Sequence, residues 1–262
     1  MHLLTRSVRF AINHGVSPPG SNGFAGNPAI DGFGRWFELL VTCRGNIDPV
    51  TGYLIDIKAV DSHVRTHALP LFERAVSERL DPAQTLQSVV RVLSGSLPVP
   101  LQSVRLCLTP YHDLEMAPSD TAHALIRQRF DFSAAHRLHS PALSDAENLK
   151  LYGKCNNPRG HGHNYIVQPV VQVRLDGAPA FSLADLESIT DSAVIKHFDH
   201  KHLNEDTTEF NVNQGGVLPS VENIARICYE RLGPVIAAHA ASPKLISVTV
   251  WETDRTSATF PA

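Results

Sequence analysis

The spacing of apolar residues divides the first half of the chain into strand-like and helix-like segments. Apolar residues alternate with polar or small ones over residues 3–13 and again over 36–44, as in half-buried strands. Helical periodicity then covers 59–80 and 82–93, and a further strand-like run covers 104–109. The pattern therefore predicts the order strand, strand, helix, helix, strand for this half.

The second half of the chain repeats this order. We expect strands over 124–135, from His161 through Val173 and over 245–252, helices from Ser182 and over 221–240, and a last extended piece ending near Phe260. Two local matches accompany the repeat: residues 10–14 parallel 132–136, and residues 32–36 parallel 160–164. The sequence therefore predicts two tandem α+β domains, 1–117 and 122–262.

The stretch from Leu151 to Tyr165 carries one cysteine and then two histidines in alternation. If His161 and His163 begin a strand, their side chains point to the same face and both imidazoles can reach one metal ion. His136, at the end of the preceding predicted strand, is the best third ligand. Three imidazoles hold zinc and leave a fourth position open, so the pattern favours a catalytic zinc site.

Cys155 leaves two interpretations of this site open. As a base or nucleophile, its thiolate would be favoured by Lys154, by Arg159 and by a nearby metal ion. As a fourth zinc ligand, the same thiolate would make the site structural. Ordinary loop histidines and a half-buried loop cysteine are the plain alternative to both.

Acidic residues and one further histidine complete the candidate set. Asp199 beside His200 can fix the tautomer of the imidazole or raise its pKa for proton transfer, although a solvated loop is the simpler interpretation of either residue alone. Glu252, at a strand end, could accept two parallel hydrogen bonds from an amino-pyrimidine edge. Glu222, at a helix start, fits a charge favoured by the helix dipole.

Composition narrows the class of protein. The chain of 262 residues has a formal net charge of -3 and no long basic run, which argues against a nucleic-acid partner. No apolar stretch approaches the roughly 18 residues of a membrane span, and residues 1–6 lack the apolar region of a signal peptide. The 4 cysteines lie far apart, so we expect reduced thiols in a cytoplasmic protein instead of disulfides.

With these residues assembled, the second half resembles the 6-pyruvoyl-tetrahydropterin synthase family. The segments that carry the resemblance follow the family's order and cover most of 124–262: Phe132–Leu138, Leu151–Tyr165, Phe198–Asn204, Pro219–Ala225 and Val250–Asp254. The first half resembles the family only over Arg44–Asp56.

The resemblance implies a T-fold in each copy, which is an antiparallel four-stranded sheet with two helices on one face. Such domains associate into barrels, with active sites at domain interfaces. The roles that the resemblance implies are zinc binding by His136, His161 and His163, general-base catalysis by Cys155, a second proton relay by Asp199 and His200, and substrate binding by Glu252, as the pterin anchor, and Glu222.

The implied substrate is 7,8-dihydroneopterin triphosphate, from which a lyase of tetrahydropterin biosynthesis eliminates triphosphate. One alternative is 6-carboxy-tetrahydropterin synthase of queuosine biosynthesis, which uses the same substrate. In that activity the cysteine typically lies closer to the His-Gly-His motif than Cys155 lies to His161 here. A second alternative is a non-catalytic homologue that binds pterin without turnover.

The first copy reads Gly32-Phe33-Gly34 where the second reads Gly160-His161-Gly162. It retains His14 but lacks the alternating histidine pair, so we expect one zinc ion per chain. We expect this degenerate copy to supply sheet edges and interface walls, because barrel closure removes exposed strand edges. A homo-oligomer, either a trimer or a dimer of tandem chains, follows from that expectation. The loop 15–34, rich in Gly, Pro and Asn, has no assigned role.

Overall fold

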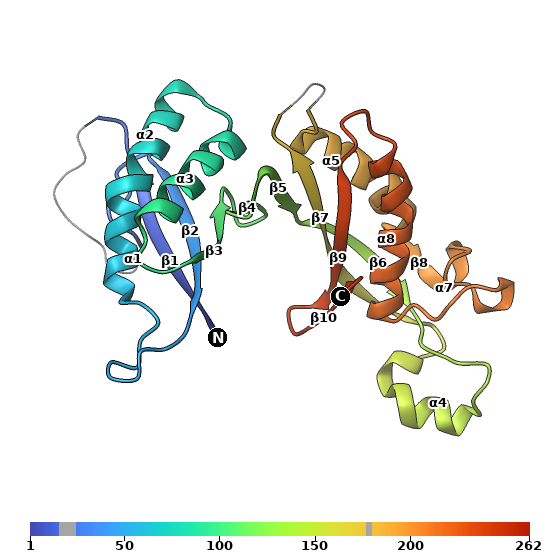
Figure 1. Cartoon of the computed structure of the whole chain (residues 1–262). Helices are drawn as coiled ribbons and strands as arrows, with labels where there is room; N and C mark the ends of the chain where they lie inside the picture. Colours follow the sequence, from blue (N-terminus) through green and yellow to red (C-terminus); the bar gives the residue numbers. More distant parts are fainter. Residues whose placement is uncertain (16–24, 177–179) are drawn as a thin grey trace. The chain divides into compact units, whose positions relative to one another are not determined.

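The computed structural model describes residues 1–15, 25–176 and 180–262, so part of the loop predicted at 15–34 lies outside the described residues. The chain forms two compact units (Figure 1). The first contains residues 1–126 and 174–176, and the second contains 127–173 and 177–262. The domain limits 1–117 and 122–262 stay a prediction.

The first unit is built on an antiparallel sheet. Its strands, in spatial order, are β1 (His2–Ile12), β2 (Arg35–Gly45), β3 (Leu101–Cys107), β4 (His112–Ala117) and β5 (Asp120–Gln128). The β1–β2 register places Phe10 opposite Phe37, and the β2–β3 register places Leu39 opposite Leu106. All four side chains are at most 7% exposed, so this face of the sheet carries the core.

The helices of the first unit cover that apolar face (Figure 1). They are α1 (Ile57–His63), the π-helix η1 (Val64–Ala68), α2 (Leu69–Glu78) and α3 (Pro82–Ser96). Asp56 and Asp81 cap α1 and α3 by accepting hydrogen bonds from backbone N–H groups of the first turn. Arg79 ends α2 in the left-handed region, with φ 55°.

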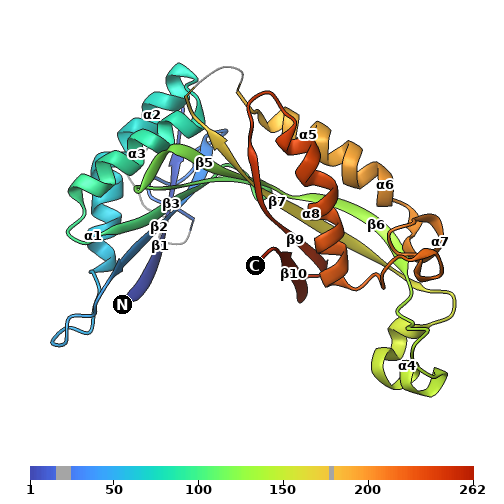
Figure 2. The same cartoon turned by 45° about the vertical axis from the view of Figure 1, so that its right-hand side comes forward.

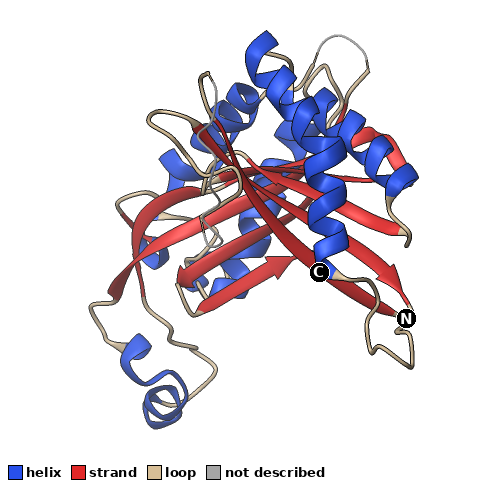
Figure 3. Cartoon of the chain, turned by 90° about the vertical axis from the view of Figure 1, so that its left-hand side faces the viewer, coloured by secondary structure: helices blue, strands red, loops and turns tan. Residues whose placement is uncertain are grey.

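The second unit repeats the architecture. Its strands, in spatial order, are β10 (Thr256–Phe260), β9 (Lys244–Thr253), β7 (His161–Arg174), β6 (Phe130–His136) and the short β8 (Lys201–His202). Only β8 runs parallel to its neighbour among these pairs. The predicted α+β fold, an antiparallel sheet with helices on one face, is therefore confirmed in both units (Figure 3), and each unit adds one strand, β5 or β8, to the four that were expected.

The helical layer of the second unit contains two principal helical segments. One is α5 (Leu183–Thr190), the π-helix η3 (Asp191–Ile195) and α6 (Lys196–Phe198); the other is α8 (Val221–Ala237), which packs against β9 and β10 (Figure 2). Ser182 and Asp185 form the predicted capping box before α5. The smaller helices are α4 (Asp145–Tyr152), η2 (Gly153–Asn156), α7 (Leu203–Asp206) and η4 (Val212–Gln214).

Three aromatic rings recur in the core of each unit. In the first unit Phe10, Phe37 and Phe72 lie with ring centroids 5.4 to 6.3 Å apart. In the second unit Phe132 lies 5.1 Å from Tyr165 and 6.1 Å from Phe198. Each trio joins the first two strands of its unit to the first helical segment, which supports the repeat inferred from the sequence.

The first helical segment of each unit buries every fourth residue. The buried positions are Val60, Val64, Ala68 and Phe72 in one unit and Leu186, Thr190, Val194 and Phe198 in the other. In an α-helix, residues spaced by four drift about 40° around the axis at each step. The π-helices η1 and η3 have more residues per turn, which cancels this drift, so the buried side chains all face the sheet.

Two element predictions were wrong in detail. The strand expected over 124–135 is two strands, β5 and β6, and a tight turn joins β5 to the preceding strand β4. The helix expected over 59–80 contains the π-helix η1, and α4 was not predicted. Patterns of alternation do not mark where one strand ends and the next begins, because both continue the same period. No helix within the described ranges is long and apolar enough to cross a membrane.

We expect Phe72→Ala to lower the free energy of unfolding by about 3–5 kcal/mol, because it removes the ring that joins α2 to β1 and β2. Phe72→Leu should cost less, roughly 1.5 kcal/mol, because it keeps most of the volume. Urea unfolding followed by circular dichroism measures both. Phe33→Ala is the matched control, since the Phe33 side chain is 100% exposed. Equal midpoints for Phe72→Ala and Phe33→Ala would contradict the proposed core.

Candidate metal centre

Three histidines meet on the helix-covered face of the second unit. In the β6–β7 register His136 lies opposite His161, and Ala134 lies opposite His163. Directly opposed residues of antiparallel strands project to the same face, and alternate residues of one strand do so as well. One ring nitrogen from each histidine lies within 4.8 Å of the others, as the alternation in the sequence predicted.

His136 is fixed in one tautomer by its surroundings. Its side chain is fully buried, and its Nδ1 lies 2.7 Å from the carbonyl oxygen of Pro219, at the residue before the N-cap of α8. A carbonyl only accepts, so Nδ1 donates and Nε2 keeps its lone pair towards the other two rings. Burial lowers the pKa of His136 from 6.5 to about 4, so the ring is neutral near pH 7, which is the form that binds metal.

The three imidazoles lie close together and leave buried nitrogens without partners. His136 Nε2 and His161 Nε2 are 3.1 Å apart, which is a hydrogen bond when His161 carries its proton on Nε2. In the part of the chain that the structure describes, His161 Nδ1 and His163 Nε2 are buried without a hydrogen-bond partner. Buried polar nitrogens are normally paired, so a cluster of histidines with unpaired nitrogens indicates a site for a cation that binds imidazole nitrogen.

Gly160 permits this arrangement of the strand end. Its φ is +70°, in the left-handed region that favours glycine. A Cβ at this position would lie 2.6 Å from His202 Nε2 and 2.9 Å from the backbone oxygen of His136. Any larger residue would therefore push β7 away from the strand that carries His136.

The loop that carries Cys155 is tied to the end of β6. Leu138 donates its backbone N–H to the Cys155 carbonyl at 2.8 Å, and the Asn156 side-chain oxygen lies 2.9 Å from His139 Nδ1 and 3.2 Å from Arg137 Nη2. Cys155 itself is half-buried and forms no disulfide. The thiol is near enough to Glu252 and Tyr165 to interact with both electrostatically.

The Cys155 thiol does not show the depressed pKa expected from neighbouring cations. Burial, and then the negative charge of Glu252, raise its pKa above the ordinary value of 9.0. Lys154 and Arg159 are exposed, so water screens their charges and they do not offset burial. The expectation that Lys154, Arg159 and a nearby metal ion together favour the thiolate stays a prediction, which now depends on the metal ion.

Glu252 lies closer to the histidines than the sequence suggested. Its Oε1 is 3.4 Å from His136 Nε2 and 3.7 Å from His163 Nε2, and its side chain is 18% exposed. Strand β9 delivers it, since Trp251 lies opposite Ile166 of β7. A carboxylate here can contact a metal-bound group directly, which adds to the ring-anchoring role expected for it.

Asp199 and His200 follow α6 and are held by strand β6. Ser133 N–H donates to Asp199 Oδ1 at 2.9 Å, and His200 N–H donates to the Ser133 carbonyl at 2.6 Å. His200 Nδ1 lies 2.8 Å from Asp199 Oδ2, so the two side chains are coupled as predicted.

This pair faces outward. The His200 side chain is 82% exposed and, with His163, lines an open cavity of about 470 Å³. Within the described residues no hydrogen bond or ion pair joins Asp199 or His200 to Cys155 or the three histidines. Glu222 is also exposed, in the first turn of α8, three residues after the Pro219 carbonyl that holds His136.

Tyr165 and His202 belong to the same site and were not predicted. The Tyr165 ring lies 5.5 Å from the His163 ring, and its fully buried hydroxyl has no partner among the described residues. Burial raises its pKa, so the phenol stays neutral and available as a donor. The His202 ring packs against Gly160, with a buried Nδ1 that has no partner within the described ranges. The alternation 161, 163, 165 could have revealed Tyr165.

The second half of the chain is similar to proteins of a known family. The profile of the 6-pyruvoyl tetrahydropterin synthase family matches residues 125–262, which include every candidate residue named above. The 6-pyruvoyl tetrahydrobiopterin synthase of Homo sapiens is 42% identical over 133 residues, which are 50% of this chain and 86% of the human protein.

Two solved structures are also similar. The 6-pyruvoyl tetrahydropterin synthase of Caenorhabditis elegans is 34% identical, with a TM-score of 0.47, over 53% of this chain and 96% of that protein. A uricase from Arthrobacter globiformis is 8% identical, with a TM-score of 0.46, over 99% of this chain and 92% of the uricase.

We expect the purified protein to bind one divalent metal ion per chain and His161→Ala to lose most of it, because two imidazoles bind far more weakly than three. Inductively coupled plasma mass spectrometry of the dialysed protein measures the metal content. His123→Ala is the matched control, since His123 pairs with Asp120 in the first unit. Full occupancy in His161→Ala, or two ions per chain, would show that the cluster is not the site.

Proposed function

Because the chain belongs to the 6-pyruvoyl tetrahydropterin synthase family, we propose that it is a carbon–oxygen lyase that eliminates triphosphate from 7,8-dihydroneopterin triphosphate. The observation that carries this proposal is the convergence of three histidine nitrogens within 4.8 Å, beside the Glu252 carboxylate. A family member that had lost its chemistry would have no reason to keep buried, unpaired imidazoles.

His136, His161 and His163 would hold zinc, since neutral imidazole suits this ion and three ligands leave a position for substrate. A bound zinc ion supplies Lewis-acid polarisation of the substrate's side-chain oxygens and a positive charge that opposes the field of Glu252. The Pro219 carbonyl keeps His136 in the ligating tautomer, and Tyr165 closes the floor of the site with a neutral hydroxyl.

Cys155 is proposed as the general base for the proton that leaves the substrate side chain. The thiol is half-buried, and Glu252 interacts with it electrostatically. A base that is protonated in the resting protein and loses its proton when positive charge enters the site is active only when the site is loaded. A thiol that stays protonated until then would not react with other molecules before the site is loaded.

Asp199 and His200 would form the second proton relay. The hydrogen bond from Ser133 N–H, and then the one from His200, lower the pKa of Asp199, so it remains a carboxylate and holds His200 Nδ1 as a donor. Nε2 of His200 is then free to exchange a proton with substrate.

The exposed side chains of the site support proposals about how substrate binds and how the chains assemble. The exposure of His200 suits a site completed against a neighbouring domain, which supports the expected homo-oligomer of two or three tandem chains. Glu252 and Glu222 would contact the pterin, Glu252 from the metal side and Glu222 from the first turn of α8. A cytoplasmic location remains part of this proposal.

We expect the protein to convert 7,8-dihydroneopterin triphosphate with release of triphosphate, and Cys155→Ala to lower kcat by about 100-fold or more, because positioned acid–base groups contribute this much. Chromatography with mass spectrometry identifies the product and distinguishes a 6-pyruvoyl from a 6-carboxy pterin. Cys107→Ala, in the first unit, is the matched control and should retain full turnover. Unchanged turnover in Cys155→Ala would exclude this base, and absence of turnover in the metal-loaded protein would exclude the lyase.

We expect Asp199→Asn to lower kcat by about 100-fold with unchanged metal content, because the amide cannot hold His200 in the same protonation state. Turnover at saturating substrate and metal analysis on the same sample measure the two effects. Asp191→Asn, which removes an exposed partner of Lys196, should leave both unaltered. Loss of metal in Asp199→Asn would show instead that the pair only supports β6.

A further inference from the structure

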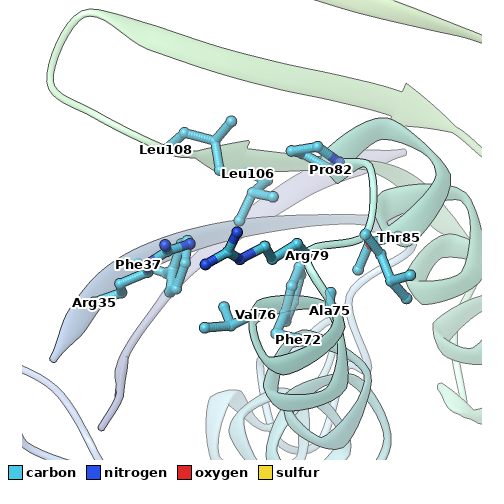
Figure 4. Close-up of a pocket in the computed structure, with 11 residues that line it drawn as sticks. Arg35, Phe37, Phe72, Ala75, Val76, Arg79, Pro82, Thr85, Leu106 and Leu108 are labelled. Carbon is cyan, nitrogen blue, oxygen red and sulfur yellow. The ribbon is translucent and has the colours of Figure 1, made fainter. Parts of the chain in front are cut away.

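The first unit contains a cavity that the proposed activity does not use. It has a volume of about 330 Å³ and lies where the turn between α2 and α3 meets β2 and β3 (Figure 4). Phe37, Phe72 and Leu106, all at most 7% exposed, form its floor, and Thr85 and Ala75 line its helical wall. The size is within the range of small-molecule sites, and the floor is apolar.

Two arginines reach this apolar cavity. Arg35 begins β2, and Arg79 follows α2 in the left-handed conformation that ends the helix. Both guanidinium groups point into the pocket region in Figure 4. Within the described ranges neither is paired with a carboxylate, and no acidic residue lines this cavity. Two unpaired positive charges over an apolar floor favour an anionic group with an apolar body.

A second cavity, of about 620 Å³, adjoins the first. It shares Arg35 and Arg79, and is lined in addition by His14 and Glu73. Among the described residues, Glu73 is the one acidic residue that lines either cavity. A single carboxylate on the ligand would therefore be preferred over a highly charged group, because repulsion by Glu73 grows with the charge of the ligand.

The cavity occupies the place that the metal centre occupies in the second unit. Phe37 and Tyr165 are equivalent, since each packs on the aromatic residue of the neighbouring strand. Two residues before them lie Arg35 in one unit and His163 in the other. The same position therefore carries a fixed cation in the first unit and a metal-binding imidazole in the second.

The strands that pair with β2 and β7, which are β3 and β9, also differ between the units at one equivalent position. Leu106 of β3 and Val250 of β9 are equivalent, because each lies opposite the residue two positions after that aromatic ring. Two residues later come Leu108, which lines the cavity, and Glu252, which lies at the histidines. Loss of the acid removes the group that would repel an anion, and the leucine extends the apolar wall.

We propose that this cavity is a second ligand site, which binds a small aromatic carboxylate with its ring on Phe37, Phe72 and Leu106 and its carboxylate between Arg35 and Arg79. The Phe37 and Phe72 rings are 6.3 Å apart and inclined by 17°, so they stack on each other and form one continuous aromatic floor against which a flat ring can pack. Guanidinium groups bind carboxylates through paired N–H donors. All residues that line this cavity belong to the first unit, so the site shares no residue with the metal centre.

The test is titration of the full-length protein with 2-naphthoate by isothermal titration calorimetry, with 2-naphthamide as the neutral ligand of equal size. We expect a 1:1 complex of 2-naphthoate with a Kd on the order of 0.1 mM. The double variant Arg35→Gln, Arg79→Asn should weaken 2-naphthoate by at least about fivefold and leave 2-naphthamide unchanged, because exposed charge pairs contribute modestly. Asn is chosen at position 79 because it tolerates a positive φ.

Two further variants keep the test decisive. Arg91→Gln removes an exposed arginine of α3 outside the cavity and should bind 2-naphthoate as the unaltered protein does. Ala75→Trp fills the cavity and should abolish binding of both ligands. Circular dichroism and pterin turnover verify that each variant folds and that the second unit is intact. Equal 2-naphthoate affinity in the double variant and in Arg91→Gln, or binding that survives Ala75→Trp, would overturn the proposal.

Discussion

The register between β6 and β7 is the constraint on which the site depends. It places His136 opposite His161 and Ala134 opposite His163, so three imidazoles share one face of a sheet. A shift of one residue would turn both β7 histidines to the other face. Gly160 admits β7 at this register, and the Pro219 carbonyl holds the third ring from the helical layer. Sheet and helix must therefore both be in place before the site exists.

The two units share a core and differ in chemistry. Each has a trio of aromatic rings between its first two strands and its first helical segment. Just beyond that trio, the second unit places imidazoles and a carboxylate, and the first places arginine and leucine. Packing in the core restricts which residue types can occupy the three aromatic positions. The positions beyond them contact solvent or ligand and are free to change. The same scaffold thus carries two different sets of side chains at equivalent positions.

Local periodicity predicted those features of the fold and the site that depend on residues close together in the sequence. The alternation of His161 and His163 and the strand that ends at His136 sufficed to locate the candidate metal ligands. The position of Glu252 against the histidines depends on the pairing of β9 with β7, and the outward direction of His200 depends on how the chain leaves α6. Such relations join distant segments and leave no local pattern. Arg35 and Arg79 likewise come from distant segments, so no local pattern indicates that they line one cavity. Residues 16–24 lie outside the part of the chain that the structure describes.

The π-helices η1 and η3 have a consequence for the history of the chain. Each lies within the first helical segment of its unit, where buried residues recur every fourth position. An ordinary α-helix turns by about 1200° from Val60 to Phe72, or from Leu186 to Phe198, which is about 120° past three full turns. With one residue fewer it would turn by about 1100°, within about 20° of three turns, so each phenylalanine would still face its core. Each π-helix therefore accommodates one additional residue without moving the aromatic ring, and it does so at the same place in both units.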